Sequence, residues 1–341
     1  MFLVRDVQRR DLPELKKLAS ELNTVNLPDN QETLASLIDK SIKSFTGSIE
    51  DALARQYLFV AEDLANKALV GTSMIIAQHG TYESPHIYYE VSEREHYSAT
   101  LDRHFRHKVL SIGYNYAGPT EIGGLVVAPR YRSNVEKIGR QLSYVRFLFI
   151  AMHRRFFRDK VLAELLPPLL PDGRSLLWEA IGKKFTGLSY QDADRLSRQN
   201  KEFIKELFPA SDIYVSLFPD RTQRVVGEVA PDTRGVKRML ERVGFRYVER
   251  IDPFDGGPHY ETNVDDISVI KLFRAGRLEK GVPAESEKHW LVAYQPSNGR
   301  NRFRAVKAAA EFVGNQVRVA REVRDHLQAP VGARVALIPF D

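Results

Sequence analysis

Three basic side chains, Arg132, Lys137 and Arg140, lie close together in this 341-residue sequence, with Gly139 among them. Arginine and lysine neutralise phosphate oxygens, and glycine lets a bulky anion approach the backbone closely. A helix N-terminus strengthens such a site, because its free amides donate hydrogen bonds and its dipole supplies partial positive charge. We therefore expect this segment to bind the pyrophosphate of a ligand such as coenzyme A (CoA).

A strand and a helix must position these residues. Residues 121–127 (GluIleGlyGlyLeuValVal) have the composition of a β-strand, and the pattern predicts a helix over about 137–156. The pantetheine arm of CoA carries amides, which can pair with the open strand edge at Leu125 and Val127. An alternative stays open, because a strand–turn–helix with ordinary surface charge has the same composition.

The segment resembles the acyl-CoA loop of GNAT-type N-acyltransferases, in which Val-x-Pro-x-x-Arg precedes a helix start rich in small residues. Residues 127–132 (ValAlaProArgTyrArg) carry the first part of that pattern. The spacer from Arg132 to Gly139 is longer than in the pattern, and Gln141 stands where a second small residue is usual. The resemblance implies an α/β fold with a mixed, largely antiparallel sheet flanked by helices.

A second motif, IleAspProPheAspGlyGlyPro at residues 251–258, resembles a signature of the arginine N-succinyltransferase family. Further similar segments follow the same order along almost the whole chain, at 27–30, 178–185, 201–209, 213–215 and 240–247. The resemblance implies transfer of a succinyl group from succinyl-CoA to the α-amine of L-arginine, the first step of a bacterial arginine breakdown pathway. It also implies that no metal and no permanently bound cofactor takes part.

The family resemblance assigns roles to several residues. Leu125 matches a position assigned to succinyl-CoA binding, although a plain core leucine would have the same surroundings in sequence. Asp255, followed by Gly256 and Gly257, suits a tight turn. Its carboxylate either meets the guanidinium of the substrate or holds the turn through an Asx hydrogen bond.

One expected group is missing. Where the family has Gly-Gln-Val-His-Pro, with the histidine as proton donor, residues 227–231 are GlyGluValAlaPro, so that Ala230 stands at the histidine position. Loss of a general acid typically lowers a rate by about 10²–10⁴-fold. Either another group carries the proton or the activity on arginine is weak. The candidates for a replacement are His259, Glu228 and Asp255, with Asp232 and Glu121 also within reach in sequence.

Composition restricts the other function classes. The net charge is +6, but basic and acidic residues are interleaved, which argues against nucleic acid as a partner. The chain has no cysteine, which excludes disulfides and a cysteinyl acyl intermediate. The longest apolar runs are far shorter than the roughly 20 residues that span a membrane, and we expect a cytoplasmic protein. His104 and His107, three apart on an expected helix, lack an obvious third ligand, so we expect no metal site.

The organisation expected from sequence is a GNAT-like acyltransferase domain at 1–275, a linker at 276–288 and a small β-barrel-like module at 289–341. Two alternatives to arginine succinylation stay open. The acceptor is a different basic amine, such as ornithine, or the chain is a catalytically silent CoA-binding subunit. The chain forms either a homo-oligomer or a hetero-oligomer. The silent subunit corresponds to the hetero-oligomer, because the family includes paired non-identical subunits.

Overall fold

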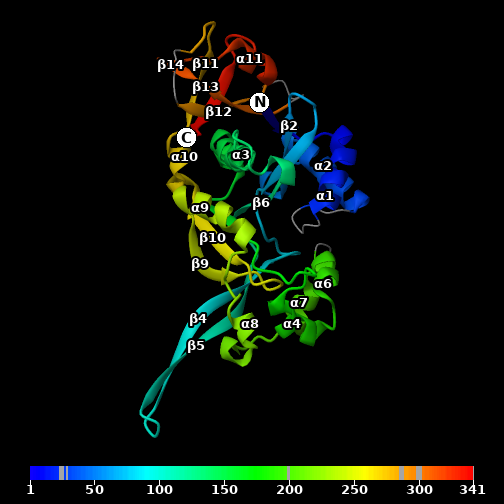
Figure 1. Cartoon of the computed structure of the whole chain (residues 1–341), viewed down its shortest axis with the longest axis vertical. Coiled ribbons are helices and arrows are strands. Elements are labelled where there is room, and N and C mark those ends of the chain that lie inside the picture. Colours follow the sequence, from blue (N-terminus) through cyan, green and yellow to red (C-terminus); the bar gives the residue numbers. More distant parts are fainter. Residues whose placement is uncertain (23–26, 28–29, 198–199, 284–287, 297–301, 341) are drawn as a thin grey trace. The chain divides into compact units, whose positions relative to one another are not determined.

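The computed structural model describes the chain except residues 23–26, 28–29, 198–199, 284–287, 297–301 and 341. The described residues form two compact units. Unit 1 contains residues 1–78, 120–159 and 264–341, and unit 2 contains residues 79–119 and 160–263. Both combine β-sheet with helices, which confirms the predicted mixed α/β class (Figure 1). In the described part of the chain no helix is long and apolar enough to cross a membrane.

The sheet of unit 1 follows the strand order β14-β15-β11-β16-β12-β13-β1-β2-β3-β6 and is antiparallel except between β11 and β15. The strands are β1 (Phe2–Asp6), β2 (Gln56–Asp63), β3 (Leu69–Ile76), β6 (Thr120–Val127), β11 (Arg274–Leu278), β12 (His289–Tyr294), β13 (Arg304–Ala309), β14 (Glu311–Val313), β15 (Gln316–Arg318) and β16 (Arg334–Pro339). The helices are α1 (Leu12–Leu22), α2 (Gln31–Phe45), α3 (Ile138–Met152), α10 (Ser268–Lys271) and α11 (Arg321–Leu327), with 3-10 turns η1 (Arg9–Asp11), η2 (Ala52–Ala54), η3 (Pro129–Tyr131), η4 (Arg154–Phe156) and η7 (Val264–Asp266).

The C-terminal strands continue the N-terminal sheet, because β1 pairs with β2 on one edge and with β13 on the other. The C-terminal strands therefore lie in the same sheet and the same unit as the N-terminal strands. The expected linker is also partly structured: residues 276–278 belong to β11, which pairs with β16, whereas 284–287 lie outside the described residues.

Strand β2 is apolar on both faces because helices cover both of them. Leu58 and Val60 pack in one core with α1 and α2. The alternate residues Tyr57 and Phe59 contact the ring of Phe149 from α3, at centroid distances of 4.7 and 5.4 Å. Successive side chains of a strand point to opposite faces, so both faces must be apolar. Figure 1 shows α3 on one side of β2 and the pair α1 and α2 on the other.

The sheet of unit 2 follows the order β7-β10-β9-β4-β5-β8, and its neighbouring strands are antiparallel. Its strands are β4 (His86–Ser98), β5 (Arg103–Asn115), β7 (Lys160–Glu164), β8 (Ile213–Tyr214), β9 (Arg246–Ile251) and β10 (Pro258–Asn263). Its helices are α4 (Leu176–Ala180), α5 (Gly182–Thr186), α6 (Tyr190–Ser197), α7 (Glu202–Leu207), α8 (Asp220–Gln223) and α9 (Arg234–Arg242), with 3-10 turns η5 (Val215–Leu217) and η6 (Pro231–Thr233).

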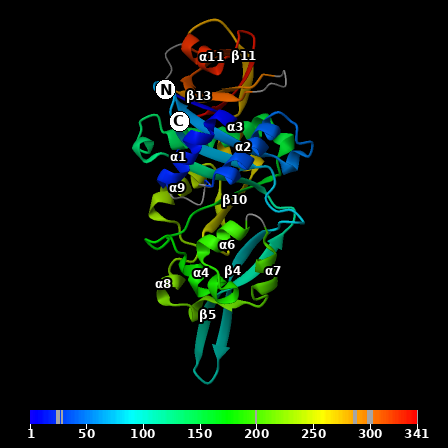
Figure 2. The same cartoon turned by 90° about the vertical axis from the view of Figure 1, so that its right-hand side faces the viewer.

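Helices α4, α6 and α7 share a core with β4 and β5, and Figure 2 shows α4 and α7 beside these strands. Trp178 of α4 is the centre of this core: it is fully buried, and its ring stacks on Phe254 with 5.0 Å between centroids. Its indole nitrogen donates to the Leu188 carbonyl at 3.0 Å, which satisfies the one polar group of the ring. The core therefore fixes the loop that contains Phe254.

Several sequence-based assignments in unit 2 were wrong. His104 and His107 lie on β5 rather than on a helix, and positions three apart on a strand point to opposite faces. The strand expected at 213–218 is only two residues long before the turn η5 begins. The single helix expected over 191–207 is two helices, α6 and α7, with residues 198–199 outside the described part.

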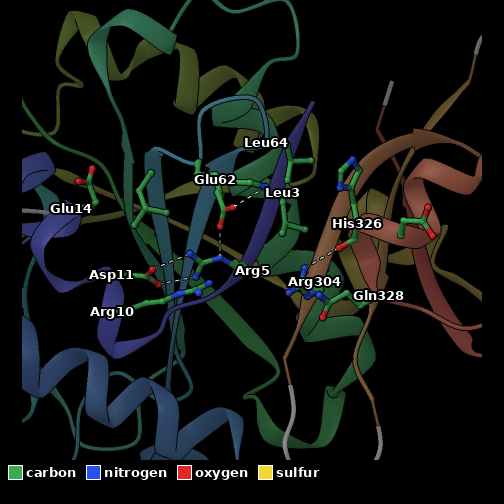
Figure 3. Close-up of a pocket in the computed structure, with 13 residues that line it drawn as sticks. Leu3, Arg5, Arg10, Asp11, Glu14, Glu62, Leu64, Arg304, His326 and Gln328 are labelled. Carbon is green, nitrogen blue, oxygen red and sulfur yellow. Dashed lines mark hydrogen bonds and ion pairs between the residues drawn. The ribbon is translucent and has the colours of Figure 1, made fainter.

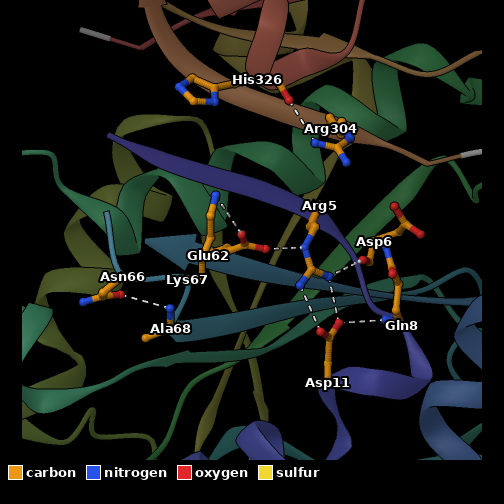
Figure 4. A network of polar contacts seen from close by, with 10 residues as sticks. All are labelled: Arg5, Asp6, Gln8, Asp11, Glu62, Asn66, Lys67, Ala68, Arg304 and His326. Atoms are coloured by element: carbon orange, nitrogen blue, oxygen red, sulfur yellow. Dashed lines mark hydrogen bonds and ion pairs between the residues drawn. The ribbon is translucent and has the colours of Figure 1, made fainter. Parts of the chain in front are cut away.

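A buried ion-pair network fixes the N-terminal strand of unit 1 (Figure 4). The guanidinium of Arg5 donates two hydrogen bonds to the Asp11 carboxylate, at 2.7 and 2.9 Å, and a third to Glu62 Oε2 at 2.9 Å. Arg5 and Asp11 are both buried. Such paired, bidentate contacts are the form in which an arginine tolerates burial. They tie β1 to the turn η1 and to β2.

Asp6 has a different environment. It is buried, its Oδ1 has no hydrogen-bond partner among the described residues, and burial raises its pKa to about 7. A carboxyl whose folded-state pKa is raised holds its proton more tightly in the folded than in the unfolded chain, so stability falls as pH rises from about 4 to about 7. We expect Asp6→Asn to raise the free energy of unfolding by about 1–4 kcal/mol at pH 8, and by little at pH 4.

Urea unfolding at both pH values measures this difference. Asp39→Asn is the control, because Asp39 is exposed in its pair with Arg9 and should change stability by less than about 1 kcal/mol. An equal effect of Asp6→Asn at both pH values would contradict the assignment.

Candidate active site

Strand β6 of unit 1 carries a β-bulge at the predicted acyl-donor segment. The pairing of β3 with β6 shifts register between Thr72 and Met74, and Gly124 there has a positive φ of 56°. The Gly124 carbonyl accepts a hydrogen bond from Thr72 Oγ1 at 2.9 Å, which fixes the bulge. Leu125 is half-buried whereas Val126 is buried, so Leu125 lies on the opposite face from this core residue. Bulges of this kind re-aim side chains next to active sites.

The long spacer between Arg132 and Gly139 is an ordered turn. The Arg132 Nε donates to the Val127 carbonyl at 3.1 Å, and Lys137 adopts a left-handed conformation with φ of 52° directly before α3. Gln141 is buried, and its Nε2 donates to the Glu136 carbonyl at 2.8 Å. The glutamine that breaks the familiar pattern thus closes the longer turn onto the first turn of α3.

The start of α3 has the properties expected of an anion site. The amides of Ile138 and Gly139 lie in the first turn, where a helix has no carbonyl of its own to offer. Arg132 and Lys137 are exposed beside it. A Cβ on Gly139 would lie 3.7 Å from the nearest atom of the chain, an ordinary contact. The fold itself therefore does not require glycine here, but a ligand that approaches the backbone would.

Arg140 differs from the other two predicted cations. Its Nη1 donates to the Phe340 carbonyl at 3.1 Å, and its guanidinium lies over the Phe340 ring. These contacts hold the end of the chain against α3. Arg140 is half-buried by these contacts, whereas Arg132 and Lys137 are exposed.

Sequence reasoning missed Arg146 on α3. This guanidinium is buried and donates to the Gly123 carbonyl of β6 at 3.2 Å and to Ser143 Oγ at 3.0 Å. Burial lowers its pKa to about 9. The partner of Arg146 is a backbone carbonyl on a different element, which no sequence pattern encodes, so only the three-dimensional structure identifies this link between α3 and β6.

In unit 2, the segment from Asp252 to Gly257 forms a tight turn between β9 and β10. Asp252 Oδ1 accepts hydrogen bonds from the amides of Phe254 and Asp255, at 2.7 and 3.0 Å. Asp255 Oδ1 accepts from the Gly257 amide at 2.7 Å. Both are Asx-type contacts. The turn-holding role that sequence allowed for Asp255 is therefore present in the structure.

The two glycines of this turn are there for different physical reasons. Gly256 has a φ of 84°, in the left-handed region that side chains rarely adopt. Gly257 has an ordinary φ, but a Cβ there would overlap with the Leu165 carbonyl oxygen. The GlyGly pair is thus required by backbone conformation at the first position and by close packing at the second.

Burial perturbs both carboxyl groups of the turn. It raises the pKa of Asp255 to about 7, against the lowering effect of the Gly257 amide. It raises the pKa of Asp252 well above its usual value, and the nearby Asp255 adds to this. Carboxyl groups with a pKa near neutrality can exchange protons at physiological pH, as general acid–base catalysis requires.

The segment that contains Ala230 lies directly beside this turn. The Gly227 amide donates to the Gly256 carbonyl at 3.1 Å, and the Ala230 amide donates to the Leu166 carbonyl at 2.9 Å. Ala230 is half-buried. Two of the neighbouring candidate acids, Glu228 and Asp232, are exposed to solvent.

His259 lies within the sheet of unit 2. It is fully buried on β10, opposite Glu164 of β7, and its Nε2 lies 3.5 Å from Glu164 Oε1. Burial lowers the pKa of His259 to about 3, so that the ring is neutral at physiological pH. A neutral, fully buried ring is a poor source of the proton that the family histidine would supply.

Each unit contains a cavity that is lined by described residues. The larger, in unit 1, has a volume of about 530 Å³ and is lined by both charge signs, including the Arg5 network, Arg304 and His326 (Figure 3). The other, in unit 2, has a volume of about 450 Å³ and is lined by Glu228, Lys237 and Tyr260 among others. Of the predicted site residues, only Glu228 lines either cavity.

Comparison with known proteins identifies the family. The family model of the arginine N-succinyltransferase beta subunit matches residues 2–269. The chain belongs to this family. An arginine N-succinyltransferase of Yersinia pestis (strain Pestoides F) is 35% identical over 348 residues, covering 99% of this chain and 97% of that protein. The arginine N-succinyltransferase of Escherichia coli (strain 55989 / EAEC) is 32% identical over 342 residues, with the same coverage.

A solved structure of the family has the same fold. The arginine/ornithine succinyltransferase subunit AI from Pseudomonas aeruginosa superimposes with a TM-score of 0.83 at 30% sequence identity, covering 100% of this chain and 99% of that one. The family resemblance predicted from the sequence is therefore confirmed, and with it the class of acyltransferase. Within the arginine N-succinyltransferase family, this chain keeps the PheAspGlyGlyPro turn and carries Ala230 at the position that we expected to hold a histidine.

The packing of the turn predicts the effect of one added methyl group. We expect Gly257→Ala to lower the free energy of unfolding by about 1–3 kcal/mol, because its Cβ would overlap with the Leu165 carbonyl and crowd Asp255. Gly235→Ala is the matched control: Gly235 lies in α9, a Cβ there would have no atom within 4 Å, and alanine favours helix. Thermal and urea unfolding measure both, and equal stability of the two variants would contradict the packing argument.

Proposed function

We propose that this chain transfers the succinyl group of succinyl-CoA to the α-amino group of L-arginine, releasing CoA and N2-succinyl-L-arginine. The observation that carries the proposal is the near full-length similarity to proteins named arginine N-succinyltransferase, at 32–35% identity. The ordered basic turn before α3 and the Asp252–Gly257 turn support it. Succinyl-CoA and L-arginine are the small-molecule partners that follow.

The reaction makes two demands on the protein. The phosphates of the donor must be neutralised, and the amides of Ile138 and Gly139 with Arg132 and Lys137 are suited to this. The α-ammonium of arginine must lose a proton before its nitrogen attacks the thioester carbonyl carbon, since an ammonium has no lone pair. The C–N bond forms, the C–S bond breaks, and the CoA thiolate leaves and takes up a proton.

Asp255 is our candidate for the group that accepts the proton of the amine. Its half-buried carboxyl has a pKa of about 7, so a large fraction is ionised at neutral pH and still basic enough to accept a proton. It lies in the turn to which the Ala230 segment is bonded through Gly227 and Gly256. Leu125, half-buried at the bulge of β6, is our candidate for contact with the acyl donor.

A different basic acceptor is the second candidate function. The related Pseudomonas aeruginosa protein is described as an arginine/ornithine succinyltransferase and as a subunit. That description motivates ornithine as an alternative acceptor. It also motivates the reading in which this chain binds CoA but depends on a second, different subunit for catalysis, since Ala230 cannot carry a proton.

A thiol-release assay separates these functions. Purified full-length chain is mixed with succinyl-CoA and either L-arginine, L-ornithine or L-lysine, and free CoA is measured. We expect release with arginine to exceed release with lysine by at least about tenfold. Release only with ornithine would replace arginine as the acceptor. No release with any amine, together with calorimetric binding of CoA, would reject the enzyme in favour of the silent subunit.

The role of Asp255 predicts a specific pH profile. We expect Asp255→Asn to lower kcat by about 10²–10⁴-fold, because asparagine keeps the Oδ1 acceptor for Gly257 but cannot accept a proton. In the unchanged protein kcat should fall as pH drops below about 7, since protonation removes the base. This inflection should be absent in the variant.

Asp252→Asn is the control, because it retains the Oδ1 acceptor for two amides of the same turn. We expect its kcat to stay within about tenfold of the unchanged protein. Equal losses in the two variants, with an unaltered pH profile, would show that Asp255 only holds the turn.

Restoring the family histidine gives an independent test. We expect Ala230→His to raise kcat by about tenfold or more, because an imidazole at a half-buried position supplies a second proton carrier. Ala230→Asn has a side chain of similar size without a titrating group and should give no increase. A histidine variant no faster than the asparagine variant would mean that position 230 does not face the reacting groups.

A further inference from the structure

Three potential metal ligands from separate segments meet in unit 2. They are His79, which follows β3 in sequence, His86 at the start of β4, and Glu164 at the end of β7. Each offers one ligand atom, and these atoms all lie within 4.8 Å of one another. His86 is fully buried, and the other two are half-buried. This constellation has no role in the proposed acyl transfer.

One distance within this group matches the spacing of two ligands on one metal ion. His86 Nε2 lies 3.4 Å from Glu164 Oε1, beyond the usual range of 2.7–3.2 Å for an N–H···O bond. Zinc bonds to histidine nitrogen and carboxylate oxygen are about 2.0–2.2 Å long, so adjacent ligands of a tetrahedral zinc are about 3.4 Å apart. The pair of His86 and Glu164 thus has the separation of one tetrahedral edge.

His79 completes a three-ligand set. Its ring approaches that of His86 edge-on, with 4.5 Å between the centroids. Its backbone is anchored, because the His79 amide donates to the Pro119 carbonyl at 2.8 Å. A Cβ on Gly80, next in the chain, would overlap with backbone atoms of Asn115 and His86, so the loop is closely packed. The histidine is therefore carried by an ordered backbone rather than by a free loop.

His259 supplies a second, independent observation. It is fully buried, and neither of its ring nitrogens has a hydrogen-bond partner in the described part of the chain. Its Nε2 is aimed at the same carboxylate oxygen, Glu164 Oε1, at 3.5 Å. A buried polar group left without a hydrogen bond typically costs about 1–3 kcal/mol. A small movement of the Glu164 carboxylate toward a bound ion would let His259 donate to its second oxygen, as outer residues of metal sites commonly do.

We propose that His79, His86 and Glu164 bind one divalent transition-metal ion, with zinc the best match, and that His259 orients Glu164 as a positioning residue. Two imidazoles and one carboxylate form a donor set that zinc uses, with a fourth position left for water. The ion links the loop at 79–86 to the end of β7. This inference replaces our expectation from sequence that the chain has no metal site, and it is independent of the proposed acyl transfer.

The site is tested by metal binding to the full-length chain. Protein dialysed against a chelator and then against buffer is titrated with ZnCl₂ by calorimetry, and bound zinc is counted by elemental analysis. We expect one zinc per chain and a rise in Tm on zinc addition, because an ion that binds only the folded state stabilises it. His79→Asn and Glu164→Gln should each weaken binding by about 100-fold or more.

Two further variants separate the site from general effects. The double variant His104→Asn/His107→Asn removes two histidines from β5, one exposed and one half-buried, and should bind zinc as the unchanged protein does. His259→Gln should keep one zinc per chain with about tenfold weaker affinity. Because His79 is half-buried, His79→Asn should fold, which circular dichroism checks. Absence of zinc binding in the unchanged chain, or undiminished binding by His79→Asn and Glu164→Gln, would overturn the proposal.

Discussion

Binding of the acyl donor, as proposed, depends on how the first turn of α3 is held beside the end of β6. Side-chain hydrogen bonds from Arg132 to Val127 and from Gln141 to Glu136 close the turn between the two elements. Arg146 links the same helix back to the Gly123 carbonyl. These contacts fix the amides at the start of α3 in advance, as the proposed phosphate site requires. An anion site assembled in this way does not have to be organised when the ligand binds.

The sequence predicted the elements whose composition matches their surroundings. Strand β2 has an apolar run because both its faces are covered, and the run was visible without a structure. The long pair of strands β4 and β5 could not be predicted from the sequence, because its outer half is exposed and charged. Pairing between β1 and β13 joins residues about 300 positions apart, and no local pattern encodes such a partner. The division into units could not be predicted for the same reason.

Some residues of the candidate site could be predicted from the sequence and others could not. The turn around Asp255 was predictable, because AspGlyGly has a local conformational preference that the Asx hydrogen bond and the φ of Gly256 bear out. The role of Arg140 could not be predicted, because its partner is the Phe340 carbonyl, which is distant in sequence. The meeting of His86 with Glu164 depends on the register of a whole sheet. Sequence thus identifies groups that act within a turn, and the fold identifies those that meet across strands.

Hydrogen–deuterium exchange with and without CoA tests the central claim most directly. We expect CoA at saturating concentration to slow the exchange of amides in residues 128–141 by about tenfold or more, with the largest effect at Ile138 and Gly139. Residues 103–115 of β5 should be unaffected and serve as the internal reference. Protection absent from 128–141, or confined to other segments while calorimetry reports bound CoA, would contradict the account.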